Sequence, residues 1–236
     1  MSDNTKIDYV DATINPQGWG CWGTCSYCYA RRLAKRNLNK CDLCNQFIPH
    51  WHPEHLEKPL HWKRPRRIFI QSMGDLFHVL TPTEQIAQVI AIARQAPQHT
   101  YLFLTKNPQR YLEFSFPNNC WLGTTITWRG RYEMSVYDIW LSRVKHPHKY
   151  ISFEPLLGEI TVVAGGMSWY IIGSQTGPGA IKPQQEWVEK LIARADQEKI
   201  PVFLKDNLLR LFPDLPRRQE LPERMVNRVK EKEGGI

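Results

Sequence analysis

From residue 67 onward, short apolar segments rich in β-branched and aromatic residues alternate with longer amphipathic segments. This alternation is typical of βα units around a parallel sheet. The segment before the first cysteine adds one earlier strand to the pattern. The expected strands are 11–15, 68–71, 101–105, 121–125, 150–153, 169–172 and 202–204. The chain is therefore predicted to form an α/β fold with about seven strands.

The clearest helix is predicted to begin at Thr81, with Pro82 at the first helical position and Glu84 closing a capping box. Its buried face would consist of Ile86, Val89, Ile90 and Ala93. A second helix is predicted over 184–198, because apolar residues recur there at helical spacing: Trp187, Val188, Leu191, Ile192 and Ala195. Further helices are expected after Cys28, Lys106 and Gly130.

A chain of 236 residues with 42% hydrophobic content can bury one substantial core. We expect one main domain over 1–212, interrupted by a structured insert at 37–65, and a peripheral extension at 213–236 that ends in a short helix. No apolar run reaches the roughly 18 residues that cross a bilayer, and no leader pattern precedes a cleavage site. We therefore expect a soluble, cytoplasmic protein with no membrane partner.

Five of the six cysteines lie between residues 21 and 44, which is the spacing of metal sites rather than of a disulfide scaffold. Cys21, Cys25 and Cys28 form a Cys-x3-Cys-x2-Cys motif, with Tyr27 immediately before the third cysteine. Three thiolates suit three corners of a [4Fe-4S] cluster and leave the fourth iron free. The alternative is zinc, although structural zinc usually takes paired Cys-x2-Cys knuckles.

A second pair, Cys41 and Cys44, has knuckle spacing and is followed by His50, His52 and His55. Two thiolates and two imidazoles, from Cys41, Cys44, His50 and His52, would complete a tetrahedral zinc site. An auxiliary iron-sulfur cluster is a rival interpretation. Reduced buried cysteines beside solvent-exposed histidines would explain the same residues without metal. The sixth cysteine, Cys120, stands alone before a strand and is expected in the core.

Positive charge is concentrated beside these cysteines. Residues 31–67 hold ten Lys or Arg against three acidic residues, out of a net charge of +8 for the chain. Such a patch favours a polyanionic partner such as nucleic acid, because phosphate contacts give long-range, salt-sensitive attraction. The aromatic residues Phe47, Trp51 and Trp62 are interleaved with the charges. A solvated basic surface without a partner is the alternative.

Polar residues follow six of the predicted strands. In β/α barrels the chemistry gathers at the C-terminal edge of the sheet, so these residues are candidates for a site. They are Ser72, Asp75, Lys106, Thr127, Glu154, Gly173, Ser174, Gln175, Lys205 and Asp206. Each one alone could be an ordinary cap or ion pair. Their repetition from strand to strand predicts one shared site.

The cysteine spacing with its aromatic neighbour resembles the defining motif of the radical S-adenosylmethionine (radical SAM) superfamily. Segments 59–69, 72–78, 104–106, 121–123, 152–158 and 177–180 look like a phage-type domain family of unknown function within that superfamily, found in phages, bacteria and archaea. The likeness covers about residues 15 to 207 and is more distant to spore photoproduct lyase, which acts on DNA. It implies a partial TIM barrel of the (β/α)6 type that carries the Cys/His-rich insert 37–65 and the short C-terminal extension.

The resemblance also implies the cofactor chemistry. The open iron would chelate S-adenosylmethionine, and an electron from an external donor would cleave it to a 5′-deoxyadenosyl radical. Ser72, Asp75, Thr125 and the loop Gly173, Ser174 and Gln175 would contact the cofactor. Lys106, Glu154 and Lys205 are the candidate catalytic residues, and they could orient the cofactor's carboxylate, pair with each other or hold substrate.

Three functions remain open. The first is radical chemistry on a nucleic-acid base or nucleotide, and the second is the same chemistry on a protein, peptide or metabolite. The third is a zinc-binding nucleic-acid module without catalysis.

Overall fold

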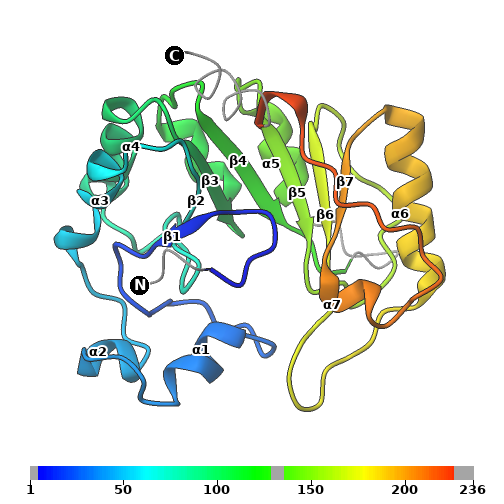
Figure 1. Ribbon diagram of the computed structural model, residues 1–236, viewed down its shortest axis with the longest axis horizontal. Coiled ribbons are helices and arrows are strands. Elements are labelled where there is room, and N and C mark those ends of the chain that lie inside the picture. The colour runs from blue at the N-terminus through cyan, green and yellow to red at the C-terminus, as the bar shows by residue number, and fades with distance from the viewer. Residues whose placement is uncertain (1–4, 129–135, 226–236) are drawn as a thin grey trace.

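The structure is a computed structural model that describes residues 5–128 and 136–225. Seven parallel strands form one sheet, and their order in the sheet is their order in the chain. The strands are β1 (Ala12–Ile14), β2 (Arg67–Ile70), β3 (Thr100–Thr105), β4 (Cys120–Thr125), β5 (Lys149–Phe153), β6 (Trp169–Ile172) and β7 (Val202–Leu204). The sheet curls into a half-barrel (Figure 1). The predicted α/β class and all seven expected strands are confirmed.

Helical segments fill most of the connections between strands. Between β1 and β2 lie α1 (Tyr29–Ala34), α2 (Asp42–Asn45), η1 (Pro53–His55) and α3 (Lys58–His61). The later segments are α4 (Thr83–Gln95), η2 (Pro108–Glu113), α5 (Tyr137–Arg143), α6 (Gln185–Glu198) and α7 (Asp206–Leu209). In Figure 1, α4, α5 and α6 cover the outside of the curled sheet, whereas α1 and α2 lie at the end where the strands finish. The insert 37–65 therefore folds as three short helical segments joined by loops.

The start of α4 differs from the prediction. The helix begins at Thr83 and has no side-chain cap, because the hydroxyl of Thr81 accepts a hydrogen bond from Gln17 Nε2 at 2.9 Å. The predicted buried face of α4 is confirmed, and Ile92 joins it. In α6 the predicted positions Val188, Leu191 and Ala195 are buried, and Trp187 and Ile192 are partly buried against the core.

The connection after Lys106 contains a 3₁₀ helix, η2, where an α-helix was expected. Two adjacent buried side chains hold this segment through tertiary hydrogen bonds. Arg110 donates to the carbonyls of His78, Val79 and Thr81, and the Tyr111 hydroxyl donates to the Gly123 carbonyl at 2.9 Å. The helix expected after Gly130 corresponds to α5, and residues 129–135 lie outside the described residues.

Side chains alternate between the two faces of the sheet, since successive strand residues point to opposite sides. On the convex face, Ile68, Phe103, Ile151 and their neighbours pack with the helices into the main core. The concave face carries a second, aromatic cluster. Its members are Tyr9, Val10, Phe69, Leu102, Trp121, Tyr150, Trp169, Ile171, Phe203 and Met225. This cluster fills the half-barrel near the N-terminal ends of the strands and leaves the C-terminal end open for a site.

Residues 213–225 run back along the edge of the sheet. Gln219 bridges Phe203 in antiparallel orientation, and the amide of Leu204 donates to Arg218 at 2.7 Å. Met225 is buried in the concave cluster. The described part of the extension therefore covers β7, and the terminal helix expected beyond it lies outside the described residues.

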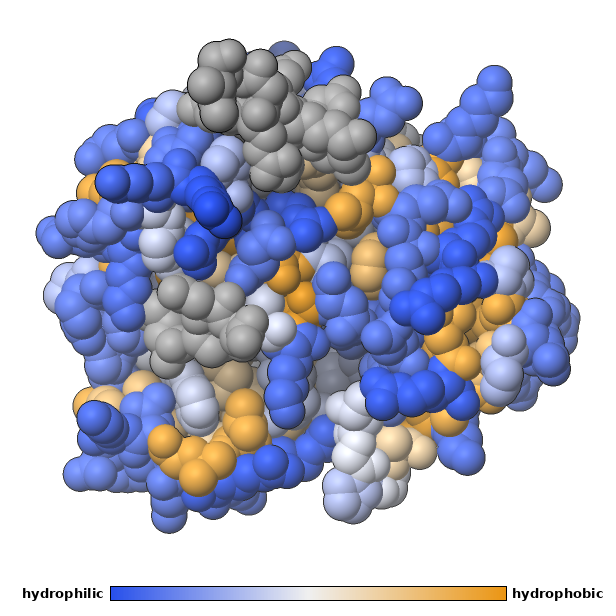
Figure 2. All heavy atoms as spheres, viewed as in Figure 1, coloured by the Kyte–Doolittle hydropathy of each residue, from blue (hydrophilic) through white to orange (hydrophobic). Residues whose placement is uncertain are grey.

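Within the described part of the chain, every helix is too short or too polar to span a bilayer. Figure 2 shows that hydrophilic residues cover most of the face seen in Figure 1, with hydrophobic residues scattered among them.

Candidate cofactor cavity and metal centre

A cavity of about 1310 Å³ opens at the C-terminal end of the concave face. The two-residue period of the strands determines which of their side chains line this cavity. Side chains two positions apart on a strand point to the same face, so the residue two positions after each inward-facing aromatic or leucine also faces the cavity. Near the strand ends these inward-facing residues are polar. The lining from the strands and the residues directly after them includes Phe69, Gln71, Leu104, Lys106, Thr125, Ser152, Glu154 and Lys205. The volume exceeds the range of about 300–1,000 Å³ that is usual for small-molecule pockets.

The three cysteines of the motif line this same cavity. Cys21, Cys25 and Cys28 lie on the loop that follows β1, and all three are partly exposed. Cys28 is the N-cap of α1, where its sulfur accepts a hydrogen bond from the Arg31 amide at 3.4 Å. The Cys21 sulfur accepts from the Gly23 amide at 3.3 Å. Burial raises the pKa of the Cys21 thiol to about 11, and the nearby Asp75, Cys28 and Cys25 add to the shift.

The spacing of these sulfur atoms bears on which metal group they fit. Tetrahedral zinc with bonds of about 2.3 Å would hold its sulfur ligands about 3.8 Å apart. Among the described residues, the groups of potential ligands whose atoms all lie within 4.8 Å of one another do not include Cys21, Cys25 and Cys28. A cube of four irons is much larger than one ion and takes three more widely separated thiolates. At least one of the distances between these three sulfur atoms therefore exceeds 4.8 Å, which is longer than a single tetrahedral zinc ion allows.

The cysteine loop is held against the insert and β2 by close backbone contacts. A Cβ atom on Gly20 would lie 2.4 Å from Pro49 N, and one on Gly74 would lie 2.2 Å from the Gly20 carbonyl oxygen. Only glycine permits this approach. Gln71 adds two hydrogen bonds to the loop, because its side chain accepts from the Gln17 amide and donates to the Gly18 carbonyl. Gln71 was not predicted as a site residue, although its position two residues after Phe69 could have indicated it.

Two predicted cofactor-binding residues, Ser72 and Asp75, line the cavity and also make structural hydrogen bonds. The Ser72 hydroxyl donates to Asn15 Oδ1 at 3.2 Å. Both carboxylate oxygens of Asp75 accept backbone amides, from Phe77 and Lys106, each at 3.0 Å. Asp75 therefore fixes the ends of β2 and β3 relative to each other.

Residues of the loop after β6 also make hydrogen bonds within the protein. Ser174 and Asn207 exchange hydrogen bonds, including Asn207 Nδ2 to the Ser174 carbonyl at 2.8 Å. Gln175 accepts the Ile181 amide at 3.2 Å. Ser174 and Gln175 line the cavity, and Gly173 lies directly behind its wall.

The three candidate catalytic residues separate into a pair and a single cation. Lys205 Nζ lies 2.5 Å from Glu154 Oε1, in an ion pair that is mostly buried. A Cβ on Gly173 would lie only 3.0 Å from Lys205 and 3.1 Å from Glu154, so this glycine makes room for the pair. Lys106 lies elsewhere on the rim, with Nζ 5.7 Å from the centre of the Tyr27 ring. Lys106 is thus placed beside the cysteine loop.

The cavity wall contains polar groups that the sequence analysis did not select. Thr125, which was predicted, is buried in the wall, and Ser152 lies beside it on the neighbouring strand. The buried Ser152 hydroxyl has no hydrogen-bond partner within the described structure. Arg32 and Arg210 also line the cavity, and Arg32 donates to the Thr176 carbonyl. The strand period could have indicated Ser152, whereas the contact of Arg32 with Thr176 depends on tertiary structure alone.

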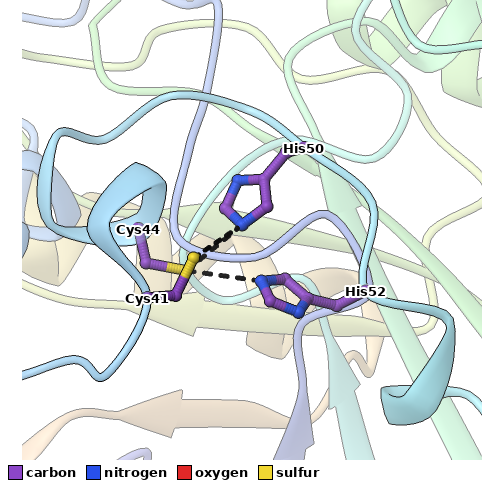
Figure 3. Close-up of side chains that lie close together, drawn as sticks. All are labelled: Cys41, Cys44, His50 and His52. Carbon is purple, nitrogen blue, oxygen red and sulfur yellow. Dashed lines mark hydrogen bonds between the residues drawn. The ribbon is translucent and has the colours of Figure 1, made fainter.

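The second predicted group comes together in the insert, as Figure 3 shows. Cys41 and Cys44 lie at the start of α2, and His50 and His52 lie on the loop that follows it. His50 Nε2 is 3.2 Å from Cys41 Sγ and 3.7 Å from Cys44 Sγ, and His52 Nε2 is 3.6 Å from Cys44 Sγ. All four ligand atoms lie within 4.8 Å of one another. This group could bind a metal ion such as zinc.

His55, the fifth residue of that sequence cluster, lies just outside the group. Its Nδ1 is 2.9 Å from the Asn15 carbonyl oxygen, and its ring stacks on His52. Cys120 is fully buried in β4, as expected from the sequence.

The aromatic side chains of the insert make contacts within the protein. Phe47 is buried, with the Arg31 guanidinium 5.0 Å from its ring centre. Trp51 and Trp62 pack partly buried against the main core, and Arg66 lies over Trp62 at 4.4 Å.

Comparison with known proteins gives one match. No curated protein and no solved structure matches the chain. A family model described as "Protein of unknown function (DUF5131)" matches residues 4–209, which include the whole sheet, the cysteine loop and the Cys/His group of the insert. The chain therefore belongs to the DUF5131 family of proteins of unknown function.

Proposed function

We propose that this protein is a radical SAM enzyme whose cavity binds a [4Fe-4S] cluster through Cys21, Cys25 and Cys28. One observation carries the proposal: three cysteines with the spacing of that superfamily line the same large cavity as the polar residues that follow five of the strands. When bound, the cluster and S-adenosylmethionine would supply an organic radical that abstracts a hydrogen atom from the substrate. The half-barrel would then be a partial TIM barrel of the (β/α)6 type.

The chain's own residues suggest how the cofactor would be held. Lys106 lies beside the cysteine loop and provides a cation for the cofactor's carboxylate. Ser72, Ser174 and Gln175 line the cavity and can offer hydrogen bonds. The carboxylate of Asp75 orients the backbone after β2 and β3, so its role would be positioning rather than direct binding.

The ion pair of Glu154 and Lys205 is the strongest candidate for the substrate side of the site. Its low exposure strengthens the interaction between the two charges. The pair lies on β5 and β7 ends, next to the unpartnered hydroxyl of Ser152. A polar substrate group in this part of the cavity could contact the pair, which would orient it.

We infer a nucleic-acid base or nucleotide as the substrate, because residues 31–67 carry a local charge of +7 and reach the cavity at Arg32, Leu33 and Phe47. Arg32, which belongs to this segment, lines the cavity directly. Since Phe47 is buried and Trp62 packs against the core, the attraction would come from cations more than from aromatic stacking. A protein, peptide or metabolite substrate is the alternative. An external electron donor would be needed in either case.

The cofactor part of the proposal is tested by anaerobic reconstitution of the full chain. We expect about four irons per chain with matching sulfide, and release of 5′-deoxyadenosine from S-adenosylmethionine after reduction with dithionite. Cys25→Ser should abolish both, whereas Cys120→Ser, in the core, should leave both unchanged. Protein that stays free of iron after reconstitution would refute the proposal and favour the zinc-binding module without catalysis.

The substrate part is tested separately by nucleic-acid binding at several salt concentrations. Neutralising about four phosphates would give a slope of about −3 in log K against log salt. The variant K63Q/R64Q, at two exposed positions of the basic segment, should bind more weakly and with a smaller slope. The matched control K145Q/K182Q removes two exposed charges elsewhere and should change neither slope nor relative affinity for different sequences. Binding that does not depend on salt concentration would favour a protein, peptide or metabolite as the substrate.

A further inference from the structure

We propose that Cys41, Cys44, His50 and His52 bind one structural zinc ion, and that this ion fixes the insert to the chain just before Cys21. The inference does not depend on the chemistry proposed for the cavity.

The geometry fits a single tetrahedral ion. Zinc bonds of about 2.3 Å to sulfur and about 2.0–2.1 Å to nitrogen place the ligand atoms roughly 3.3–3.8 Å apart. The three sulfur-to-nitrogen distances of 3.2, 3.6 and 3.7 Å lie close to this range. A polynuclear iron-sulfur cluster would need thiolates that stand further apart, so the arrangement favours zinc over an auxiliary cluster.

The surroundings of the two imidazoles are those of metal ligands. His50 Nδ1 lies 2.7 Å from the Ile48 carbonyl oxygen, and His52 Nδ1 lies 2.5 Å from a carboxylate oxygen of Glu54. Both acceptors favour a proton on Nδ1, and in the neutral ring this leaves Nε2, the atom that faces the sulfur atoms, free to bind a metal ion (Figure 3). This second layer of hydrogen bonds is usual for histidines that bind metal.

The site is closed, which indicates a structural rather than a catalytic role. Cys44 is buried, and its sulfur also accepts the Trp19 amide at 3.3 Å. Gly18 covers the group at a left-handed φ of +61°, and a Cβ there would lie 2.7 Å from His50 and 2.9 Å from His52. Four protein ligands with no open position are typical of structural zinc.

The position of the site links two parts of the chain. The His52 amide donates to the Pro16 carbonyl at 2.7 Å, and the Trp19 amide donates to the Cys44 sulfur. These contacts fall within residues 16–20, the five residues that precede Cys21. An ion held by Cys41, Cys44, His50 and His52 would therefore hold residues 16–20 in place. Loss of the ion would release them together with the insert.

Metal analysis of the full chain, purified without added chelator, tests the site. We expect about one zinc per chain in the wild type and less than about 0.1 in C41S/C44S. The controls are Cys120→Ser, which removes a buried thiol elsewhere, and Cys25→Ser, which removes a thiol of the cavity. Both should keep their zinc. Iron in place of zinc, wild-type protein without metal, or zinc retained in C41S/C44S would overturn the inference.

A second measurement keeps the test valid if C41S/C44S fails to fold. Cobalt(II) added to metal-free wild-type protein should give the intense visible absorption of a tetrahedral ion together with thiolate charge-transfer bands. A weak octahedral spectrum would overturn the inference. Hydrogen exchange gives the structural readout. Zinc removal should accelerate the amides of residues 17–20 at least about tenfold while those of α6 stay unchanged, and equal rates with and without zinc would refute the anchoring role.

Discussion

Replacing Gly20 by alanine should weaken the attachment of the cysteine loop to the insert. An ideal Cβ at this position would lie 2.4 Å from Pro49 N, 2.5 Å from the Ile48 carbonyl carbon and 2.7 Å from its oxygen. All three atoms belong to the backbone, so no side-chain rotation can relieve the contact. Ordinary van der Waals contact begins at 3.4 Å, so the two backbones must separate by about 1 Å.

Overpacking of this kind costs roughly 1–3 kcal/mol. With about 2 kcal/mol and a urea m-value of about 3 kcal/mol per molar, the unfolding midpoint should fall by about 0.7 M. The assay is urea unfolding of the purified chain followed by tryptophan fluorescence. We also expect reconstituted iron to fall in G20A, because the displaced backbone leads directly into Cys21.

Gly165→Ala is the matched control. A Cβ on Gly165 would meet no atom within 4 Å, so its midpoint should stay within about 0.3 M of the wild type or rise slightly. A Gly20→Ala midpoint equal to that of the wild type would refute the reasoning. So would an equal loss of stability in both variants, because the effect would then follow from glycine content rather than from contact.

Three further predictions concern the frame of the site. Asp11→Asn should destabilise the chain by about 1–2 kcal/mol at pH 7, because the carboxylate accepts three hydrogen bonds from Arg67. Burial alone would raise the pKa of Asp11, but the hydrogen bonds and charge of Arg67 lower it. The difference between wild type and Asp11→Asn, measured by urea unfolding, should therefore be complete above about pH 5 and shrink as the pH falls below about 4. A pH-independent difference would contradict this account. Asp75→Asn should lower the free energy of unfolding by about 1–3 kcal/mol, because the side chain of asparagine has one acceptor oxygen where Asp75 uses two, one for each backbone N–H group. An unchanged midpoint in urea would exclude the positioning role. Asn119→Ala should cost about 1–2 kcal/mol in the same assay, since its side chain donates to the carbonyl of Ala93, in the last turn of α4, and to that of His99, which follows the helix. Amide exchange near the end of α4 should also become faster.

The candidate site could be predicted from sequence where its residues follow from local patterns. The spacing of Cys21, Cys25 and Cys28 and the strand ends at Lys106, Glu154 and Lys205 indicated one shared location, and the structure places all of them around one cavity. The insert's Cys41, Cys44, His50 and His52 were selected by spacing alone and lie together. What the cavity binds stays a prediction.

Other features depend on contacts between distant segments. Nothing local to Asp75 shows that its carboxylate holds two backbone amides, and the start of α4 moved because Gln17 engages Thr81. The pairing of Glu154 with Lys205 depends on Gly173 after the intervening β6, because the missing side chain of this glycine leaves room for the two to meet.

The sequence by itself determined the strands, the buried faces of α4 and α6 and both cysteine groups, because strand period, helix period and ligand spacing act within a few residues. Only the tertiary structure decided which polar groups lie close together, how the C-terminal extension covers β7 at Gln219, and how closely the cysteine loop packs against the insert at Gly20. The physical reason is that close packing and hydrogen bonding between remote segments depend on the curvature of the whole sheet, which no local pattern encodes.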